Sequence, residues 1–313
     1  MLDSAMALWL TRQHCVDLMP EWSDFDLKID ALTGGITNKL FRIQISNGEE
    51  YVIRVYGEKT DLFIDRHVEM ENILLMEPSG VTPRLIKYIP ERNVTIVEFI
   101  AGTPFKNEDF LAEDLIEKIV RPIQLIHNSG VKLSRLFDPL EETRKLYKIL
   151  KGVGPEYTEF DILGTLDILG KISAISRIRP SSYLPCHNDL LADNFIMVEK
   201  QNRYREPVYL IDWEYAGMNT PYYEISDMFQ EIIVPKQIED KILRAYWEDS
   251  NMDEHFLKTD MFRPFPDIYW FLWSLIQQNI SRIKFDFYNY GRVKYENAQK
   301  SIQFLREHYA LSI

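Results

Sequence analysis

Cysteine is scarce in this sequence, because only Cys15 and Cys186 occur among 313 residues and they stand far apart. Two distant cysteines exclude a disulfide framework and are typical of a reducing compartment. The chain also lacks an uninterrupted apolar run of the roughly 18 residues that a membrane-spanning helix needs. Its opening, MLDSAMALWLTRQHC, carries Asp3 early and has no basic start before a long apolar core, so no signal peptide is expected. We therefore predict a cytoplasmic protein without membrane insertion.

Runs of basic residues are likewise missing. The chain holds 36 Lys and Arg against 48 Asp and Glu, which gives a formal net charge of -12. Nucleic acids and anionic membrane surfaces select for basic patches, so we expect neither as a partner. The charge favours a small cationic substrate instead. It does not define the oligomeric state, and a homodimer remains open.

Internal repeats and low-complexity tracts are absent as well, and the remaining composition is that of a globular protein. Hydrophobic residues make up 46% and charged residues 27% of the chain, which excludes a disordered protein. A length of 313 residues allows two domains or one large bilobal domain with substantial cores.

The first hundred residues carry the signals of an antiparallel sheet. Alternating apolar and β-branched residues over 27–57 predict three strands, with turns at Gly34-Gly35 and Asn47-Gly48. Helical periodicity follows over 61–76. Two further strands, RLIKYI and NVTIVEFI, are expected after this helix.

The pattern changes at the segment AGTP, residues 101–104, where glycine and proline indicate a hinge. Beyond it, apolar residues recur mostly at helical spacing, interrupted by two short strands, FIMVE and PVYLID, that predict a hairpin. A sheet followed by a helical half is the layout of an α+β, bilobal, protein-kinase-like fold. We expect a small β-rich N-lobe over residues 1–100 and a larger helical C-lobe over 101–313.

The segment HNDLLADNFIM, residues 187–197, carries the most specific chemical signal. Asp189 stands five residues before Asn194, the spacing at which the catalytic loop of kinases holds its base and a magnesium ligand. A later apolar run ends at Asp212, and Glu214 follows two residues on. One carboxylate for a hydroxyl proton, with carboxylate and amide oxygens for Mg²⁺, is the outline of a phosphoryl-transfer site. Any of these residues alone would be better interpreted as a cap or turn residue, but their combined spacing favours catalysis.

Three further residues are expected to support this site. His187 more often packs in such a loop and bonds to the backbone than transfers protons. Arg54 occupies the place where a kinase keeps the lysine of its third strand, and Glu69 on the following helix can pair with it. Arginine can hold two phosphate oxygens at once, whereas the alternative interpretation is a surface salt bridge of little energetic worth.

Aromatic residues cluster near the C-terminus. Trp270 and Trp273 are three residues apart on an expected helix and therefore share a face, and Tyr290 follows in FDFYNY. An aromatic stripe at this spacing is usually part of a core. In an acidic chain that also holds Tyr215 and Glu231, the alternative is a box that binds a small organic cation through cation–π attraction.

Taken together, five segments resemble the choline/ethanolamine kinase family, a protein-kinase-like family that acts on amino alcohols. The resemblance extends over residues 30–305, nearly the whole chain, and keeps the family's order. It is carried by GGITNKLFRI, RVYGEKTDLFIDR, CHNDLLADNF, LIDWEYAGMNTPYYEISDMFQE and FLWSLIQQNISRIKFDFYNY. A match in five parts is far more specific than one motif.

The resemblance implies an ATP-dependent kinase with Mg²⁺, whose N-lobe binds the nucleotide and whose C-lobe holds the catalytic and substrate-binding residues. It makes Asp189 the base and Asn194 and Asp212 the magnesium ligands, with Glu214 as the acid beside them. The other implied residues are Gly35, Thr37 and Asn38 in the phosphate-facing loop, Arg54 and Glu69 at the phosphates, Glu98 and Phe99 in the adenine-binding strand, and Tyr215, Glu231, Trp270, Trp273 and Tyr290 around the amino headgroup.

The sequence departs from the family at two positions, since Glu224 and Asp227 stand where the family more often has Asp and Asn. The segments GITNKL, YGEKT, IDR, NDLL and FDF favour ethanolamine as the substrate, with choline as the close second, and bacterial-type choline kinases carry a similar LIDWEY segment. An aminoglycoside or sugar substrate is a further alternative, against which the tryptophan pair counts. A nucleotide-binding scaffold without activity is another, against which the intact base and metal ligands count.

Overall fold

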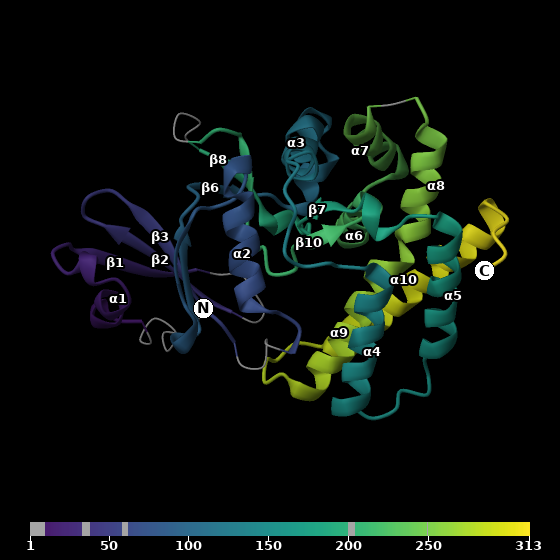
Figure 1. The fold of residues 1–313 in the computed structure, drawn as a ribbon, viewed down its shortest axis with the longest axis horizontal. Helices are drawn as coiled ribbons and strands as arrows, with labels where there is room; N and C mark the ends of the chain where they lie inside the picture. Colours follow the sequence, from purple (N-terminus) through teal and green to yellow (C-terminus); the bar gives the residue numbers. More distant parts are fainter. Residues whose placement is uncertain (1–9, 33–37, 58–61, 200–203, 249) are drawn as a thin grey trace.

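The structure is a computed structural model that describes residues 10–32, 38–57, 62–199, 204–248 and 250–313. It has a sheet-rich part at one end and a larger helical part at the other, with helix α2 between them (Figure 1). The predicted α+β, bilobal, protein-kinase-like fold is confirmed.

The sheet-rich part is built on five antiparallel strands in the order β1-β2-β3-β5-β4. Strands β2 and β3 form a hairpin whose turn contains Gly48, with a φ of +93° that glycine adopts without steric cost. The expected turn at Gly34-Gly35 lies outside the described residues. The strand bounds are β1 Leu27–Leu32, β2 Lys39–Ile45, β3 Glu50–Val55, β4 Leu85–Ile89 and β5 Val94–Glu98.

Two helices flank this sheet. Helix α1, Arg12–Leu18, contributes Cys15 to an apolar core with Phe41 and Ile53 of the sheet. Helix α2, Arg66–Met76, begins later than the sequence periodicity predicts, because the Asp65 carboxylate caps it by accepting the backbone N–H groups of the first turn. This start places Glu69 in the first turn of α2, facing the sheet.

The helical part contains two small sheets that hold the candidate site. Strand β8 pairs with both β6 and β9, and β7 pairs with β10. The predicted hairpin of β8 and β9 is confirmed, whereas β6, β7 and β10 were not predicted, because three residues are too few to show an alternating pattern. The bounds are β6 Gly102–Pro104, β7 Leu184–Cys186, β8 Phe195–Val198, β9 Val208–Leu210 and β10 Gly217–Asn219.

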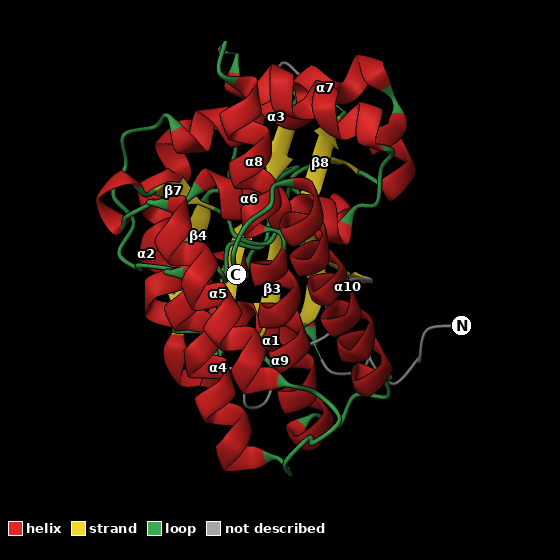
Figure 2. Cartoon of the chain, turned by 90° about the vertical axis from the view of Figure 1, so that its right-hand side faces the viewer, coloured by secondary structure: helices red, strands yellow, loops and turns green. Residues whose placement is uncertain are grey.

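The remaining helices surround these sheets, and α9 lies among them (Figure 2). Helix α9 is buried on all sides from Pro264 to Gln277, so it forms the centre of the helical part. Helix α10 approaches α9 closely at Gly291, where a Cβ atom would lie 2.0 Å from the Ser274 hydroxyl oxygen. The helices are α3 Ile116–His127, α4 Pro139–Val153, α5 Ile162–Ser176, α6 Pro221–Glu231, α7 Lys236–Trp247, α8 Met252–Phe262, α9 Pro264–Ile280 and α10 Phe287–His308; the short 3₁₀ helices are η1 Pro20–Trp22, η3 Glu77–Ser79, η4 Pro90–Arg92, η5 Asn107–Leu111, η6 Glu113–Leu115, η7 Pro180–Ser182 and η8 Ala192–Asn194.

The two parts share buried apolar contacts as well as a chain connection. Met70, Ile73 and Met76 of α2 belong to the same core cluster as the apolar face of α3. The chain leaves the five-stranded sheet at Glu98 and enters the small sheet at Gly102. We propose that the lobe boundary falls between residues 100 and 101, with α2 packed across it.

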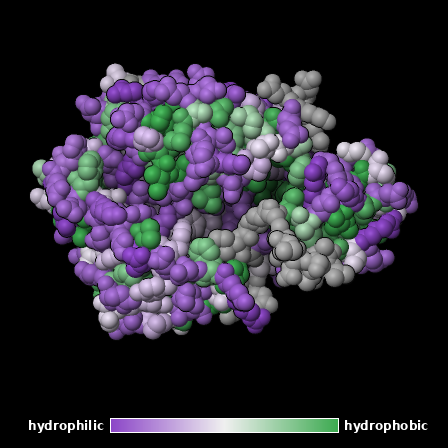
Figure 3. Space-filling model, turned by 180° about the vertical axis from the view of Figure 1, so that it is seen from behind, coloured by the Kyte–Doolittle hydropathy of each residue, from purple (hydrophilic) through white to green (hydrophobic). Residues whose placement is uncertain are grey.

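Hydrophilic side chains dominate the face seen in Figure 3. None of the described helices is long and apolar enough to cross a bilayer. Cys15 and Cys186 are both free and buried.

Candidate active site

The first element of the site is the 187–194 loop, which connects β7 to β8. Asp189 and Asn194 are both 7% exposed. The Asn194 side-chain amide donates to the Asp189 backbone carbonyl at 2.8 Å and faces its carboxylate oxygen Oδ2 at 3.4 Å. Because the amide nitrogen is used in this way, the amide oxygen is the atom left for a cation. The structure thus brings the expected base and one expected metal ligand together.

The electrostatics of Asp189 are dominated by burial and by other acids. Burial, followed by the negative charges of Asp227, Asp212 and Glu214, raises the pKa of the Asp189 carboxyl well above its usual range. A bound cation or a positively charged substrate would lower this pKa again. The acids around Asp189 therefore favour the binding of a positively charged group.

Asp212 approaches the loop from β9. The backbone N–H of Ile211 donates to the Asn194 carbonyl at 3.0 Å, which ties the two expected metal ligands to each other. Asp212 itself has a φ of +68°, in the left-handed region that side chains other than glycine seldom adopt. Backbone conformations of this kind occur preferentially at functional sites.

Carboxylates converge on Arg54 at this point. The Arg54 guanidinium lies 3.0 Å from Glu69 and 2.9 Å from Asp212, and it also contacts Glu214. The expected pair of Arg54 and Glu69 is therefore present. Oxygen atoms of Glu69, Asp212 and Glu214 lie within 4.8 Å of one another. Such hard oxygen donors suit Mg²⁺, so the residues fit the ion that kinases of this fold use.

Sequence reasoning missed a second arginine here. Arg66, the first residue of α2, lies 2.6 Å from Glu69 and 2.9 Å from Glu214, and it stacks over the Tyr56 ring at 3.9 Å. Its spacing of three residues from Glu69 on a helix was the available signal. Two guanidinium groups thus face the acids.

The loop expected to face the phosphates is described only in part. Asn38 lies against Arg54: with its amide oxygen turned toward the guanidinium, it accepts hydrogen bonds of 2.6 and 3.1 Å. The expected residues Gly35 and Thr37 lie outside the described residues.

In the strand expected to hold adenine, two backbone N–H groups already donate hydrogen bonds to other backbone groups. The N–H of Glu98 donates to the Arg84 carbonyl at 2.9 Å, and the N–H of Phe99 donates to the Glu50 carbonyl at 3.1 Å. These two N–H groups therefore cannot donate to a base without breaking bonds within the sheet. Any role of Glu98 and Phe99 in holding adenine is narrowed to their carbonyl groups.

His187 packs in the loop and contacts the backbone, as expected. The ring is fully buried, its Nε2 atom lies 2.9 Å from the Ile211 carbonyl, and it packs edge-on against Trp213. Burial lowers the pKa of His187, so the ring is neutral at neutral pH. His187 therefore holds the loop against β9.

Glu224 of α6 holds the backbone of the 187–194 loop, a role that the sequence did not reveal. One of its oxygens accepts the backbone N–H groups of His187 at 2.5 Å and Asn188 at 2.8 Å, and the other contacts the His127 ring. The second ring nitrogen of His127 lies 2.5 Å from the Tyr246 hydroxyl. Burial acts to raise the pKa of Glu224, but the His127 contact and the N–H bond from Asn188 outweigh it and lower the pKa.

The aromatic residues form a continuous series of ring contacts. Tyr215 packs edge-on against Trp270 at 5.2 Å, and Trp270 against Trp273 at 5.6 Å. Phe287, which sequence reasoning missed, continues the series from Trp273 and reaches Tyr290 through Phe285. The Tyr290 hydroxyl faces Glu231 at 3.4 Å. Trp270 and Trp273 are 7% and 8% exposed, so both are also members of the apolar core.

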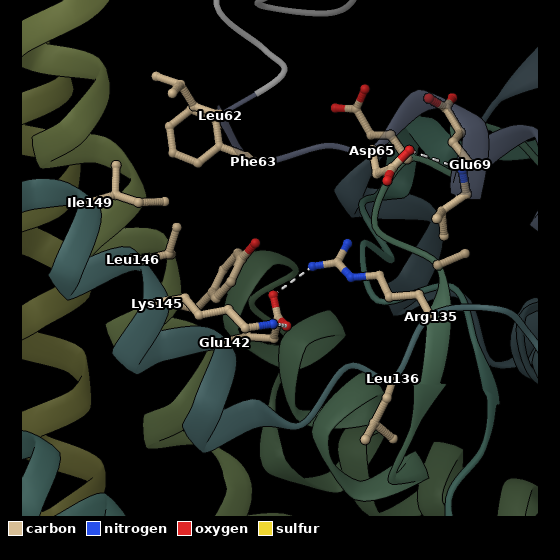
Figure 4. Close-up of a pocket in the computed structure, with 14 residues that line it drawn as sticks. Leu62, Phe63, Asp65, Glu69, Arg135, Leu136, Glu142, Lys145, Leu146 and Ile149 are labelled. Atoms are coloured by element: carbon tan, nitrogen blue, oxygen red, sulfur yellow. Dashed lines mark hydrogen bonds and ion pairs between the residues drawn. The ribbon is translucent and has the colours of Figure 1, made fainter.

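A pocket of about 280 Å³ opens beside these residues, between α2 and α4 (Figure 4). Glu69 and Glu214 line one side, and Tyr269, which contacts both Tyr215 and Trp270, lines another. The Arg135 side chain points across it toward Glu142 at 2.7 Å (Figure 4). The pocket borders the site but does not include Asp189 or Asn194, so it is a neighbouring space.

Fold and site together define a class, the phosphotransferases of protein-kinase-like fold. A model of the choline/ethanolamine kinase family matches residues 29–259. The chain therefore belongs to the choline/ethanolamine kinase family, and it is an ATP-dependent phosphotransferase.

Individual relatives agree with this assignment. Ethanolamine kinase 1 from Mus musculus is 26% identical over 321 residues, which cover 89% of this chain and 85% of the relative. Ethanolamine kinase 1 from Homo sapiens is 28% identical, covering 89% of this chain and 68% of the relative. The structure of the choline kinase LicA from Streptococcus pneumoniae aligns with a TM-score of 0.78 at 24% identity, covering 93% of this chain and 98% of that one. The last likeness shows that the fold is shared.

Proposed function

We propose that this enzyme transfers the terminal phosphoryl group of ATP to the hydroxyl of a small amino alcohol, with ethanolamine favoured and choline the second candidate. The observation that carries the proposal is the convergence of Asp189, Asn194 and Asp212 at one end of an aromatic series that ends beside Glu231. The comparisons support either amino alcohol. The ethanolamine kinases among the relatives favour the first.

The described side chains have distinct roles in this proposal. Asp189 orients the substrate hydroxyl and accepts its proton late in the transfer. Asn194 and Asp212, with Glu214 beside them, hold Mg²⁺, which when bound neutralises charge on the ATP phosphates. Arg54 exchanges carboxylate contacts for phosphate oxygens, and Glu69 keeps its guanidinium in place.

The aromatic residues Tyr215, Trp270, Trp273 and Tyr290 enclose the amino headgroup, with the acid Glu231 at its margin. Aromatic faces attract a cation without needing hydrogen bonds, so they suit choline as well as ethanolamine. Buried tryptophans offer few donors or acceptors to a sugar, which counts against an aminoglycoside.

One assay tests the proposal. ADP formation from ATP is measured in a coupled assay with ethanolamine, choline and an aminoglycoside in parallel, each with and without Mg²⁺. We expect turnover with one or both amino alcohols, only in the presence of Mg²⁺. Turnover with the aminoglycoside alone, or the same ATP consumption with no acceptor added, would overturn the proposal.

The variant Trp273→Phe tests whether the tryptophan rings bind the amino headgroup. We expect the KM for the amino alcohol to rise about two- to tenfold, because phenylalanine attracts a cation less strongly than tryptophan does. The KM for ATP should stay constant. Phenylalanine is preferred to alanine, since a cavity at a buried tryptophan would cost about 3–5 kcal/mol of stability.

Trp247→Phe is the matched control, because Trp247 stacks on His255 and Tyr222, away from the series. It should change neither KM. If Trp273→Phe raises the KM values for ATP and amino alcohol equally, Trp273 is only a core residue.

A further inference from the structure

The proposed substrate is a cation, and the acid expected to balance it already has a partner. Lys294 of α10 is 5% exposed, and its ammonium lies 2.5 Å from Glu231. The same ammonium donates to the Gln230 carbonyl at 3.1 Å. Glu231 is therefore neutralised from within the protein, and the charge of the substrate needs another counterpart.

Asp227, one turn earlier on α6, is a buried acid on which Lys294 acts only from a distance. It is 0% exposed, and its Oδ1 accepts the Trp270 indole N–H at 2.8 Å. Its other oxygen, Oδ2, is buried and has no hydrogen-bond partner among the described residues. Within that part of the chain, no Lys, Arg or His nitrogen lies within 4.0 Å of Asp227 to form an ion pair.

A buried carboxylate oxygen without a partner is costly and needs an explanation. Holding Trp270 does not supply one, because asparagine has an oxygen that accepts the same indole N–H. The contact with Trp270 therefore does not explain why an acid stands at this position.

The place of Asp227 links the two ends of the site. Its charge acts on Asp189 more strongly than that of any other acid, and it also acts on Tyr290. The bond to Trp270 places Asp227 beside the aromatic rings expected to face the nitrogen, and its effect on Asp189 is consistent with a position near the carboxylate expected to face the hydroxyl. Ethanolamine and choline both carry their hydroxyl and nitrogen only two carbons apart, so a substrate whose hydroxyl faces Asp189 would have its nitrogen in the neighbourhood of Asp227.

We infer that Asp227 is a specificity-determining residue whose free oxygen Oδ2 accepts a hydrogen bond from the primary ammonium of the substrate. The inference rests on the proposed function and names the substrate class as a primary amino alcohol. The trimethylammonium of choline has no N–H to donate, so it gains only attraction at a distance from the same acid. The ammonium of ethanolamine gains both the hydrogen bond and the attraction.

The ionisation of Asp227 is consistent with this role. Burial, followed by the charge of Glu231, raises the pKa of Asp227 to about 8. At neutral pH the acid is thus mostly protonated before a substrate enters. An incoming ammonium stabilises the carboxylate form and satisfies the oxygen.

The test is Asp227→Asn, which keeps the shape and the bond to Trp270 but removes the charge. Steady-state kinetics with ethanolamine and with choline give kcat/KM for each. We expect the value for ethanolamine to fall about ten- to a hundredfold, as is typical for loss of a charge-assisted hydrogen bond. The value for choline should fall much less, and the KM for ATP should not change.

The control is Asp267→Asn, which removes another fully buried acid. Oδ2 of Asp267 is bonded to the Gln230 amide, and Oδ1 has no hydrogen-bond partner among the described residues but lies 3.9 Å from the Lys294 ammonium, so Asp267 has an ion-pair partner that Asp227 lacks. This variant should leave the ratio of the two kcat/KM values unchanged. The thermal midpoint of Asp227→Asn should stay within a few degrees of the wild type, because asparagine has the same shape as the uncharged acid and keeps the bond to Trp270.

The outcomes separate the inference from the proposed function. If the wild type phosphorylates neither amino alcohol, the proposed function fails. If it phosphorylates them but Asp227→Asn lowers both values equally, lowers neither, or lowers the thermal midpoint by several degrees, then Asp227 has a general or structural role and the inference is wrong.

Discussion

Asp189→Asn is expected to lower kcat by about a hundred- to ten-thousandfold, which is the usual range for loss of a general base. Asparagine keeps the size of the side chain but cannot accept the hydroxyl proton. ATP affinity should remain measurable, because the proposed nucleotide contacts come from other residues. Single-turnover phosphorylation of ethanolamine and a direct ATP-binding titration measure the two effects separately.

Asp193→Asn is the matched control for this experiment. Asp193 is an exposed acid in the same loop, so the variant makes the same change of charge a few residues away. Its kcat should stay within about twofold of the wild type, since surface substitutions rarely perturb a site. Near-normal activity of Asp189→Asn would remove Asp189 from the mechanism.

Glu224→Ala is expected to have the largest effect on stability, lowering the free energy of unfolding by about 3–5 kcal/mol. The substitution leaves two backbone N–H groups of the 187–194 loop and the His127 ring without their buried partner. Urea unfolding followed by circular dichroism measures the change. Because the loop also carries Asp189, we expect the residual folded protein to turn over more slowly.

The comparison variant is Glu206→Ala, which breaks the pair of Glu206 with Arg121 at 3.3 Å. Arg121 is largely exposed, so this pair should contribute less than about 1 kcal/mol. If Glu224→Ala also costs less than that, the Glu224 network does not hold the loop in place.

The limits of sequence reasoning are clear at particular residues. The β2–β3 hairpin was predictable because alternation and an Asn-Gly turn are local signals. Helix α8 was missed, although Met252, Phe256 and Thr259 are spaced for a helix, because its sequence MDEHFLKTDMF is polar between them. Glu224 was noticed only as a departure from a family pattern. Its partners His127, His187 and Asn188 lie far away in the sequence, so no spacing could connect them.

By itself the sequence determined the reaction class. The five-residue spacing from Asp189 to Asn194 and the apolar run that ends at Asp212 depend on contacts within one loop and one hairpin, and such local geometry is encoded in adjacent residues. The same is true of Trp270 and Trp273, which share a helix face.

Only the tertiary structure decided how charges are paired within the site. It paired Glu231 of α6 with Lys294 of α10, and it left Oδ2 of Asp227 without a hydrogen-bond partner among the described residues. It also brought Arg54 and Arg66 to the acids beside Asp212. Pairing between distant elements depends on how helices and sheets pack, and the free energy of a buried charge depends on every neighbour that packing supplies. For that reason, residue types and spacing indicate which groups can react, whereas the fold decides which of them remain available to a substrate.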